Sequence, residues 1–286
     1  MNTVNDALSP LWAKDLPLDA AIHRFTVGRD PELDLAAHVR MLAAAKLIKQ
    51  SDTSALLGAL QAQYALSMAG AVRIEASQED CHTALEAALV AATGEAGKRI
   101  HLARSRNDQV LVDLKLFTRS RLWQVAEATR RVFDQLIARS EQHKADLLPG
   151  YTHLQIAMPS SFGLWFGAYA ESLSDDVLTL QTAYRFANRN PLGSGAGYGS
   201  SFPLNRTLTT ELLGFEGLHV NVVYAQMSRG KTEQTALTAL AAVATTIGRM
   251  AMDICLYNSQ NFGFLTLPDA LTTGSSIMPH KKNPDV

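Results

Sequence analysis

Residues 235–257 read TALTALAAVATTIGRMAMDICLY, and their apolar positions decide the fold class. Steps of four and three residues alternate along the stretch, at Ala236, Leu240, Val243, Ile247, Met250, Ile254 and Tyr257. This period lays the side chains along one stripe of an α-helix, a seam that is typical of helices packed in a bundle. The stretch therefore predicts one long helix with helical neighbours.

Two other stretches predict helices of comparable length. Residues 100–148 contain no glycine or proline, and leucines and valines recur there at helical spacings. A second candidate follows Pro159, with apolar residues along one face from Phe162 to Tyr184. Helices this long exceed the usual globular range, and apolar surface on two of their sides needs partners. We expect an all-α fold, built as a bundle of long helices within an oligomer.

The N-terminal part of the sequence differs, because its helical segments are shorter. Asp30-Pro31-Glu32 resembles a helix cap with proline at the first helical position, and Ser77 with Asp80 resembles a capping box. We therefore expect a small helical N-terminal domain at residues 1–104 and the long-helix bundle domain at residues 105–286. The best strand signal, Leu218–Tyr224, is short and isolated.

The charge balance and the cysteine count exclude several classes of partner. Lys and Arg number 26 against 27 Asp and Glu, a net charge of −1 that offers no basic surface to nucleic acid or an anionic membrane. Cys81 and Cys255 lack metal-site spacing and are interpreted as reduced thiols. Residues 1–6 do not open a signal peptide, and the apolar run Thr235–Ile247 is too short to span a bilayer. We expect a soluble, cytoplasmic protein without a metal.

Three polar segments interrupt the apolar pattern. Arg104–Gln109 is either a solvated helix cap or, with two guanidiniums beside an amide, a carboxylate site. In Pro149–Gln155, a loop between two long helices, the histidine is either structural or a proton-transfer group. Thr272–Asp285 is either a flexible surface turn or a mobile loop leading into a helix N-terminus that attracts a carboxylate.

A fourth segment, Asn190–Phe202, has glycines at positions 193, 195, 197 and 199. A phosphate-binding loop needs a preceding strand and G-x-G-x-x-G spacing, but Tyr198 occupies the position of the last required glycine. We therefore interpret these glycines as a tight turn or a close approach of two chain segments, and infer no nucleotide.

Several motifs together resemble a known family. Residues 274–284 read GSSIMPHKKNP, which closely resembles the signature of the fumarase/aspartase superfamily. Within that superfamily, Ser105–Gln109 and Gly150–Gln155 are similar to motifs of the argininosuccinate lyase family, and Asn190–Gly193 and Ser259–Phe264 fit the same family. The resemblance extends over nearly the whole chain from about residue 36, and three motifs in the same order make it specific.

The resemblance implies a homotetramer with a central helical bundle, in which three subunits meet at each active site. It implies cleavage of argininosuccinate into arginine and fumarate, the last step of arginine synthesis, without a cofactor. It also implies that Ser275, on a closing loop, and His153 transfer the protons; we favour Ser275 as base and His153 as acid, and the sequence leaves this direction open. The implied substrate-binding residues are Asn107, Thr152, Lys281, Asn283, Arg229, Ser105, Arg106 and His82.

The sequence departs from the family pattern in three places. The segment that carries a substrate-binding serine before Ala36 is missing, and Leu35 has no hydroxyl to replace it. The usual Ser-Asp-Arg-Asp reads Met227-Ser228-Arg229-Gly230, so two carboxylates are absent there. Family members continue well beyond Val286, so the resemblance implies that this sequence is the first part of a longer chain with a further domain.

Two alternative functions stay open on the sequence. One is a sister lyase that acts on another succinyl compound, although those enzymes usually lack the Ser105–Gln109 motif. The other is a catalytically silent or structural relative, which the missing serine favours and the retained Ser275, His153 and Lys281 oppose.

Overall fold

The computed structural model describes residues 31–72 and 74–285. Three short helices come first, α3 (Pro31–Ala44), α4 (Gln50–Met68) and α5 (Cys81–Thr93), followed by the 3₁₀ helix η1 (Gly94–Arg99). The remaining helices are α6 (Arg106–Gln142), α7 (Phe162–Ala187), α8 (Arg206–Leu212), α9 (Val222–Met227), α10 (Lys231–Asn258) and the 3₁₀ helix η2 (Asp269–Leu271). The predicted all-α class is confirmed. The expected cap residue Asp30 lies outside the described residues.

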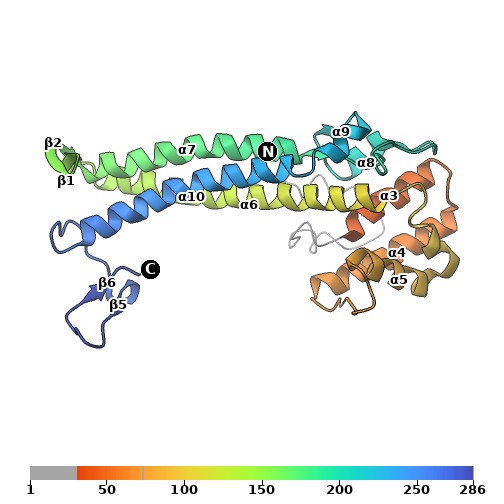
Figure 1. Ribbon diagram of the computed structural model, residues 1–286, viewed down its shortest axis with the longest axis horizontal. Helices are drawn as coiled ribbons and strands as arrows, with labels where there is room; N and C mark the ends of the chain where they lie inside the picture. The colour runs from red at the N-terminus through yellow and green to blue at the C-terminus, as the bar shows by residue number, and fades with distance from the viewer. Residues whose placement is uncertain (1–30, 73, 286) are drawn as a thin grey trace. The chain divides into compact units, whose positions relative to one another are not determined.

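The three long helices predicted from the periodicity are present as α6, α7 and α10, with 37, 26 and 28 residues (Figure 1). Each is uninterrupted, as the absence of proline from its interior allows. Helix α5 ends at Thr93, and Gly94 follows it with a φ of 61°.

The chain divides into two compact units, and the long helices contribute to both. Unit 1 holds the described residues up to Gln124 together with Thr182–Ala236. Unit 2 holds Val125–Gln181 and the described residues from Leu237 onward. This division follows spatial compactness and cuts through the three long helices. The domain boundary at residue 104 stays a prediction.

The hydrophobic core of unit 1 lies where α3, α4 and α5 meet the start of α6. Leu35, Leu56, Leu89 and Val112 are almost fully buried in it. The position expected to lack a substrate-binding serine is thus a core leucine. Helix α5 begins differently from the prediction: its cap is Asp80, which accepts a hydrogen bond from the Thr83 N–H at 2.8 Å, and not Ser77. The Asp80 carboxylate satisfies the first free amides of the helix itself.

Short strands occur where the sequence predicted loops. β1 (Leu147–Thr152) and β2 (Gln155–Ser161) form an antiparallel hairpin between α6 and α7, within unit 2. In unit 1, β3 (Arg189–Asn190) pairs in parallel with β4 (Gly217–Leu218). The weak strand signal at residues 218–224 was wrong beyond Leu218, because α9 starts at Val222 with the Asn221 side chain as its cap. In unit 2, β5 (Thr273–Gly274) pairs with β6 (Lys282–Asn283).

Helix α10 corrects the expectation about membrane-spanning length. By length and composition alone, Lys231–Asn258 is long and apolar enough to cross a bilayer, with a mean hydropathy of 1.5 over its most apolar part. In unit 2 its polar groups face α7: Asp253 accepts hydrogen bonds from Trp165 Nε1 at 3.0 Å and Tyr169 Oη at 2.6 Å. These partly buried polar groups of α7 and α10 thus satisfy one another's hydrogen bonds.

The same substitution should have opposite effects on stability at two helical glycines of unit 2. A Cβ at Gly163 would lie 2.6 Å from the backbone of Ser140 and Lys144, whereas one at Gly248 would meet nothing within 4 Å. Gly163→Ala should lower the free energy of unfolding by about 1–3 kcal/mol through overpacking. Gly248→Ala should raise it by about 0.5–1 kcal/mol, since alanine costs less backbone entropy in a helix. Urea unfolding followed by circular dichroism measures both, and equal effects would contradict the packing of α7 on α6.

Candidate active site

Ser105 and Asn107 begin α6 and are tied to each other. The Ser105 hydroxyl accepts hydrogen bonds from the backbone N–H of Asn107 at 3.2 Å and from its side-chain Nδ2 at 3.4 Å. The Asn107 side chain is exposed, so its amide is available to a ligand. Serine and asparagine suit this position because their short polar side chains satisfy the free N–H groups of the first helical turn.

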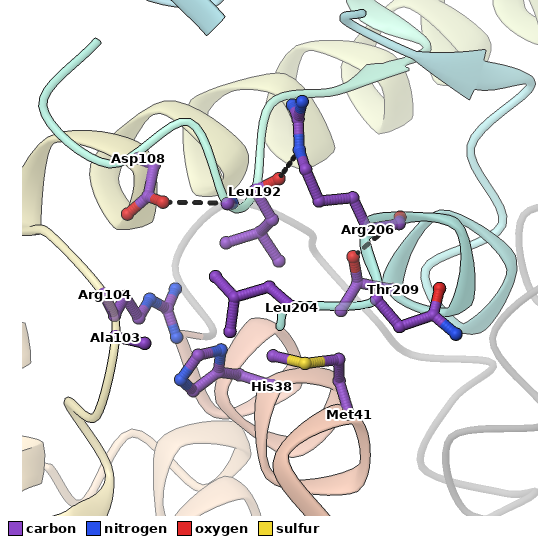
Figure 2. Close-up of a pocket in the computed structure, with 11 residues that line it drawn as sticks. His38, Met41, Ala103, Arg104, Asp108, Leu192, Leu204, Arg206 and Thr209 are labelled. Atoms are coloured by element: carbon purple, nitrogen blue, oxygen red, sulfur yellow. Dashed lines mark hydrogen bonds between the residues drawn. The ribbon is translucent and has the colours of Figure 1, made fainter. Parts of the chain in front are cut away.

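The buried carboxylate of Asp108 joins this helix start to the glycine-rich segment. Its Oδ1 accepts from Ser105 N at 3.2 Å, and its Oδ2 accepts from the backbone N–H groups of Gly193 and Gly195 at 3.0 Å each. Burial raises the pKa of Asp108, while Arg104 and these N–H groups act in the opposite direction. Figure 2 shows Asp108 bonded to this segment beside a cavity of about 10 Å³, room for roughly one water molecule.

The glycines form the tight, closely packed turn that the sequence predicted. Gly193 and Gly195 have φ values of 78° and 57°, which glycine adopts without steric cost. A Cβ at Gly193 would lie 2.8 Å from the Arg206 side chain, and one at Gly195 would lie 2.8 Å from the carbonyl of Gly199. The segment is therefore a close-packed turn whose amides serve Asp108.

Two arginines of this region are held by carboxylates. Arg104 forms a buried ion pair with Asp34 of α3, and burial lowers the pKa of Arg104 to about 10. Arg106 lies 3.4 Å from Asp80, the cap of α5, and also reaches the Thr83 hydroxyl at 3.4 Å. Both guanidiniums thus fasten α6 to the preceding helices.

His82 lies in the first turn of α5 and is 5% exposed. Its Nε2 is 3.4 Å from Asp113 of α6. Burial lowers the pKa of His82 to about 4, so the imidazole is neutral near pH 7. A neutral, enclosed imidazole packs between helices and has little surface to offer a ligand.

Arg229, between α9 and α10, is brought to the start of α6. Its Nη2 donates to the backbone carbonyl of Asn107 at 2.6 Å, and its Nε donates to Gln226 Oε1 at 3.2 Å. The Gln226 amide nitrogen in turn donates to Ser194 Oγ at 3.0 Å and to the Gly195 carbonyl at 3.2 Å. Unit 1 therefore gathers His82, Ser105, Arg106, Asn107 and Arg229 around the N-terminus of α6.

In unit 2, Thr152 and His153 lie at the tip of the β1–β2 hairpin. Thr152 pairs with Gln155, so His153 and Leu154 form a two-residue turn with φ values of 53° and 59°. Such turns need left-handed backbone at both positions, which costs side chains other than glycine and asparagine some strain. The turn leaves the His153 imidazole exposed.

The strand that leads into the turn of this hairpin is held by aromatic packing within unit 2. The Tyr151 ring lies 5.5 Å from that of Phe262 and 6.4 Å from that of Phe264, both just past the end of α10. Tyr257 joins the same cluster against Trp165 of α7 at 5.5 Å. These contacts fix the strand that leads into Thr152 and His153.

Ser275, Lys281 and Asn283 lie in unit 2 on the β5–β6 hairpin. Ser275 follows β5 and accepts the Met278 N–H at 3.2 Å, while Asn283 pairs with Thr273 across the strands. Lys281 is exposed. The helix start expected at Asn283-Pro284-Asp285 is not seen among the described residues, because Lys282 and Asn283 form β6 instead.

Sequence reasoning missed Asp108 and Gln226 as parts of the site. Asp108 belongs to the motif Ser105–Gln109, and a buried acceptor beside a glycine-rich segment is a signal that could have indicated it. Gln226 had no such signal, since Ser194 and Gly195, which accept from its amide nitrogen, lie 32 and 31 residues away in the sequence. Within the part of the chain that the structure describes, no group of three His, Cys, Asp or Glu side chains is arranged for a metal ion.

Comparison with known proteins defines the class. A family model described as "Lyase" matches residues 2–286. Because the match covers almost the whole chain, all ten predicted site residues lie inside it. The chain belongs to this lyase family.

Individual relatives show a more specific similarity than the family model does. Argininosuccinate lyase of Bacteroides fragilis is 58% identical over 96% of this chain, and the chain spans 64% of that protein's length. Argininosuccinate lyase of Stenotrophomonas maltophilia is 39% identical over 96% of this chain and is covered to 67%. Among solved structures, an EDDS lyase variant with bound fumarate is 26% identical, with a TM-score of 0.81 over 97% of this chain and 54% of its own.

Replacing the Asp108 side chain should lower the stability of the folded chain considerably. Asp108→Ala leaves three N–H groups without their acceptor and removes a negative charge that acts on the buried Arg104, so the free energy of unfolding should fall by about 2–4 kcal/mol. Asp134, exposed and paired with Arg130 on the same helix, is the matched control. Asp134→Ala should change that free energy by less than about 0.5 kcal/mol. Urea unfolding of both variants tests this, and a small effect at Asp108 would contradict the clamp.

Three buried histidines of unit 1 should make the folded chain less stable at acidic pH. Burial lowers the pKa values of His38, His82 and His219 to about 4 from 6.5. The unfolded chain therefore binds more protons between pH 6.5 and 4, so stability is complete above that window and falls with the pH inside it. Each histidine contributes a slope of up to about 1.4 kcal/mol per pH unit. Urea unfolding at several pH values measures the slope, which His82→Gln should reduce; an unchanged slope would contradict the burial of His82.

Proposed function

We propose that this chain provides the larger part of an argininosuccinate lyase, which cleaves argininosuccinate into arginine and fumarate. The observation that carries the proposal is the 58% identity to a curated argininosuccinate lyase over 96% of the chain. The retained motifs at Ser105–Gln109, Gly150–Gln155 and Gly274–Pro284 support it, because they supply the groups that the reaction needs.

The reaction is a β-elimination. A base removes a proton from the carbon next to a succinyl carboxylate, the C–N bond breaks as the C=C bond of fumarate forms, and an acid protonates the departing guanidino nitrogen. We assign Ser275 as the base and His153 as the acid. Both lie on exposed hairpin loops of unit 2, the kind of segment that closes on a substrate. The Ser275 alkoxide needs stabilisation, for which nearby backbone N–H groups and Lys281 are suited.

Substrate recognition needs donors for carboxylates, and the proposed binding residues are rich in them. Asn107, Thr152, Arg229, Lys281 and Asn283 are assigned to direct contact, together with the Ser105 hydroxyl. Arg106 and His82 are assigned behind them, because Arg106 is paired with Asp80 and His82 is enclosed. The elimination breaks a C–H and a C–N bond without net oxidation or reduction, so the proposal includes no cofactor.

We further propose that the working enzyme is a soluble, cytoplasmic homotetramer whose active sites combine residues of different subunits. Apolar side chains left exposed on long helices support this assembly, among them Leu164, Leu178, Leu237 and Met252. Neither nucleic acid nor a membrane is a partner in this proposal, in keeping with the net charge of −1.

Release of fumarate from argininosuccinate, followed by ultraviolet absorbance, tests the function. Ser275→Ala and His153→Asn should each lower kcat by about 10²–10⁴-fold, the usual contribution of a proton-transfer group. The controls are Ser51→Ala, at an exposed position of α4, and His143→Asn, at a half-buried position after α6 where the histidine is paired with Asp146. Near-normal turnover in either loop variant would refute the role of that residue.

A second arm separates the function of these residues from the length of the chain. A chimera joins residues 1–286 to the C-terminal third of the Bacteroides fragilis relative and is assayed beside the chain alone. Turnover by either protein supports the proposal. Silence of both, with folding verified by circular dichroism, overturns it in favour of a catalytically silent relative.

A further inference from the structure

Arg229 differs from Arg104 and Arg106 because the groups that hold its guanidinium carry no negative charge. Both of its hydrogen-bond partners are uncharged, namely the Asn107 carbonyl and the Gln226 side-chain amide. Among residues 31–72 and 74–285 no carboxylate pairs with it, and its Nη1 bonds to none of them. The guanidinium is thus fixed in direction while its positive charge stays uncompensated.

The neighbouring arginines show the contrast. Arg104 is buried against Asp34, and Arg106 lies against Asp80. An arginine paired with a carboxylate has little further attraction for an anion, because the two charges cancel at short range. Of these three guanidiniums in unit 1, only that of Arg229 keeps its full charge for a ligand.

Gln226 holds a central place in a closed ring of hydrogen bonds. The ring runs from Arg229 to Asn107, through Ser105 and Asp108 to Gly195, and back through Gln226. The orientation of the Gln226 side-chain amide is fixed chemically, because the Gly195 carbonyl requires the amide nitrogen and Arg229 Nε requires the amide oxygen. A primary amide is the side-chain group that donates at one end and accepts at the other without carrying charge.

We propose that Gln226 is a positioning residue that aims the Arg229 guanidinium without neutralising it, and so keeps its charge for a substrate carboxylate. The inference rests on the proposed function and deepens it by naming the residue that sets the strength of one carboxylate contact. It also accounts for the departure at Met227-Ser228-Arg229-Gly230: where the family usually has carboxylates beside this arginine, here a neutral amide one helical turn earlier holds it.

Two substitutions separate charge from packing. Gln226→Glu keeps the shape and the acceptor toward Arg229, but it loses the donor to Ser194 and the Gly195 carbonyl and adds a negative charge beside the guanidinium. Gln226→Met keeps a similar length, adds no charge, and loses both the donor and the acceptor. Both variants lose the donor, so a purely structural role should change the free energy of unfolding and KM in step in both of them, whereas the proposal makes Glu raise KM by more than its loss of stability accounts for.

The experiment measures kcat and KM for argininosuccinate, and the Kd of fumarate by calorimetry, at two salt concentrations, together with the free energy of unfolding in urea. Gln226→Glu should raise KM and Kd about tenfold or more, the effect of weakening one charge-assisted bond, with kcat nearly unchanged. Gln226→Met should raise them by only about two- to fivefold. The salt dependence of fumarate binding should fall in the Glu variant, because less net charge faces the ligand.

The matched control is Gln142→Glu, since the exposed Gln142 accepts from Arg139 at 3.0 Å across the same three-residue spacing. It should leave KM and Kd unchanged. An effect of Gln226→Met equal to or larger than that of Gln226→Glu, or a fall in kcat without a rise in KM, overturns the positioning role while the proposed function stands. Absence of both turnover and fumarate binding in the unaltered chain and in the chimera overturns both proposals.

Discussion

The buried Asp108 carboxylate is the interaction on which unit 1 depends most. It accepts three backbone N–H groups, one from the start of α6 and two from the glycine-rich turn, 85 and 87 residues further along the chain. A buried carboxylate is costly unless several donors and a cation surround it. The turn must therefore keep the backbone that points its amides inward, which is why Gly193 and Gly195 are glycines with positive φ.

The placement of charge follows from which arginines find acidic partners. The guanidiniums of Arg104 and Arg106 pair with Asp34 of α3 and with Asp80, the cap of α5. These ion pairs join the start of α6 to the two preceding helices. Arg229 meets only amide and carbonyl oxygens, and its charge stays available. The three arginines thus differ in their partners: two are held by carboxylates, and Arg229 is the one for which we propose a substrate carboxylate.

In unit 2 the proposed proton-transfer groups lie in the turns of two hairpins, and aromatic packing holds the strand that leads into one of these turns. Tyr151 packs on Phe262 and Phe264, so the strand before His153 is fixed while the turn itself is open. Ser275 lies in the loop that joins β5 to β6. A group that must reach a substrate and then release product is served by such an arrangement, because a fully packed loop could not move.

The sequence by itself determined the all-α class, the three long helices and the family, because apolar periodicity and short motifs are local properties of the chain. It did not predict the β1–β2 hairpin, since Pro149, Gly150 and Pro159 are poor strand residues that only the pairing of the two strands accommodates. Nor did it predict that Asp108 holds the glycine turn, that Gln226 holds Arg229, or that Asp80 caps α5 in place of Ser77. Tertiary structure decided the pairings of Asp108 and Gln226, because each joins groups that only folding brings together and whose burial or charge no spacing rule encodes.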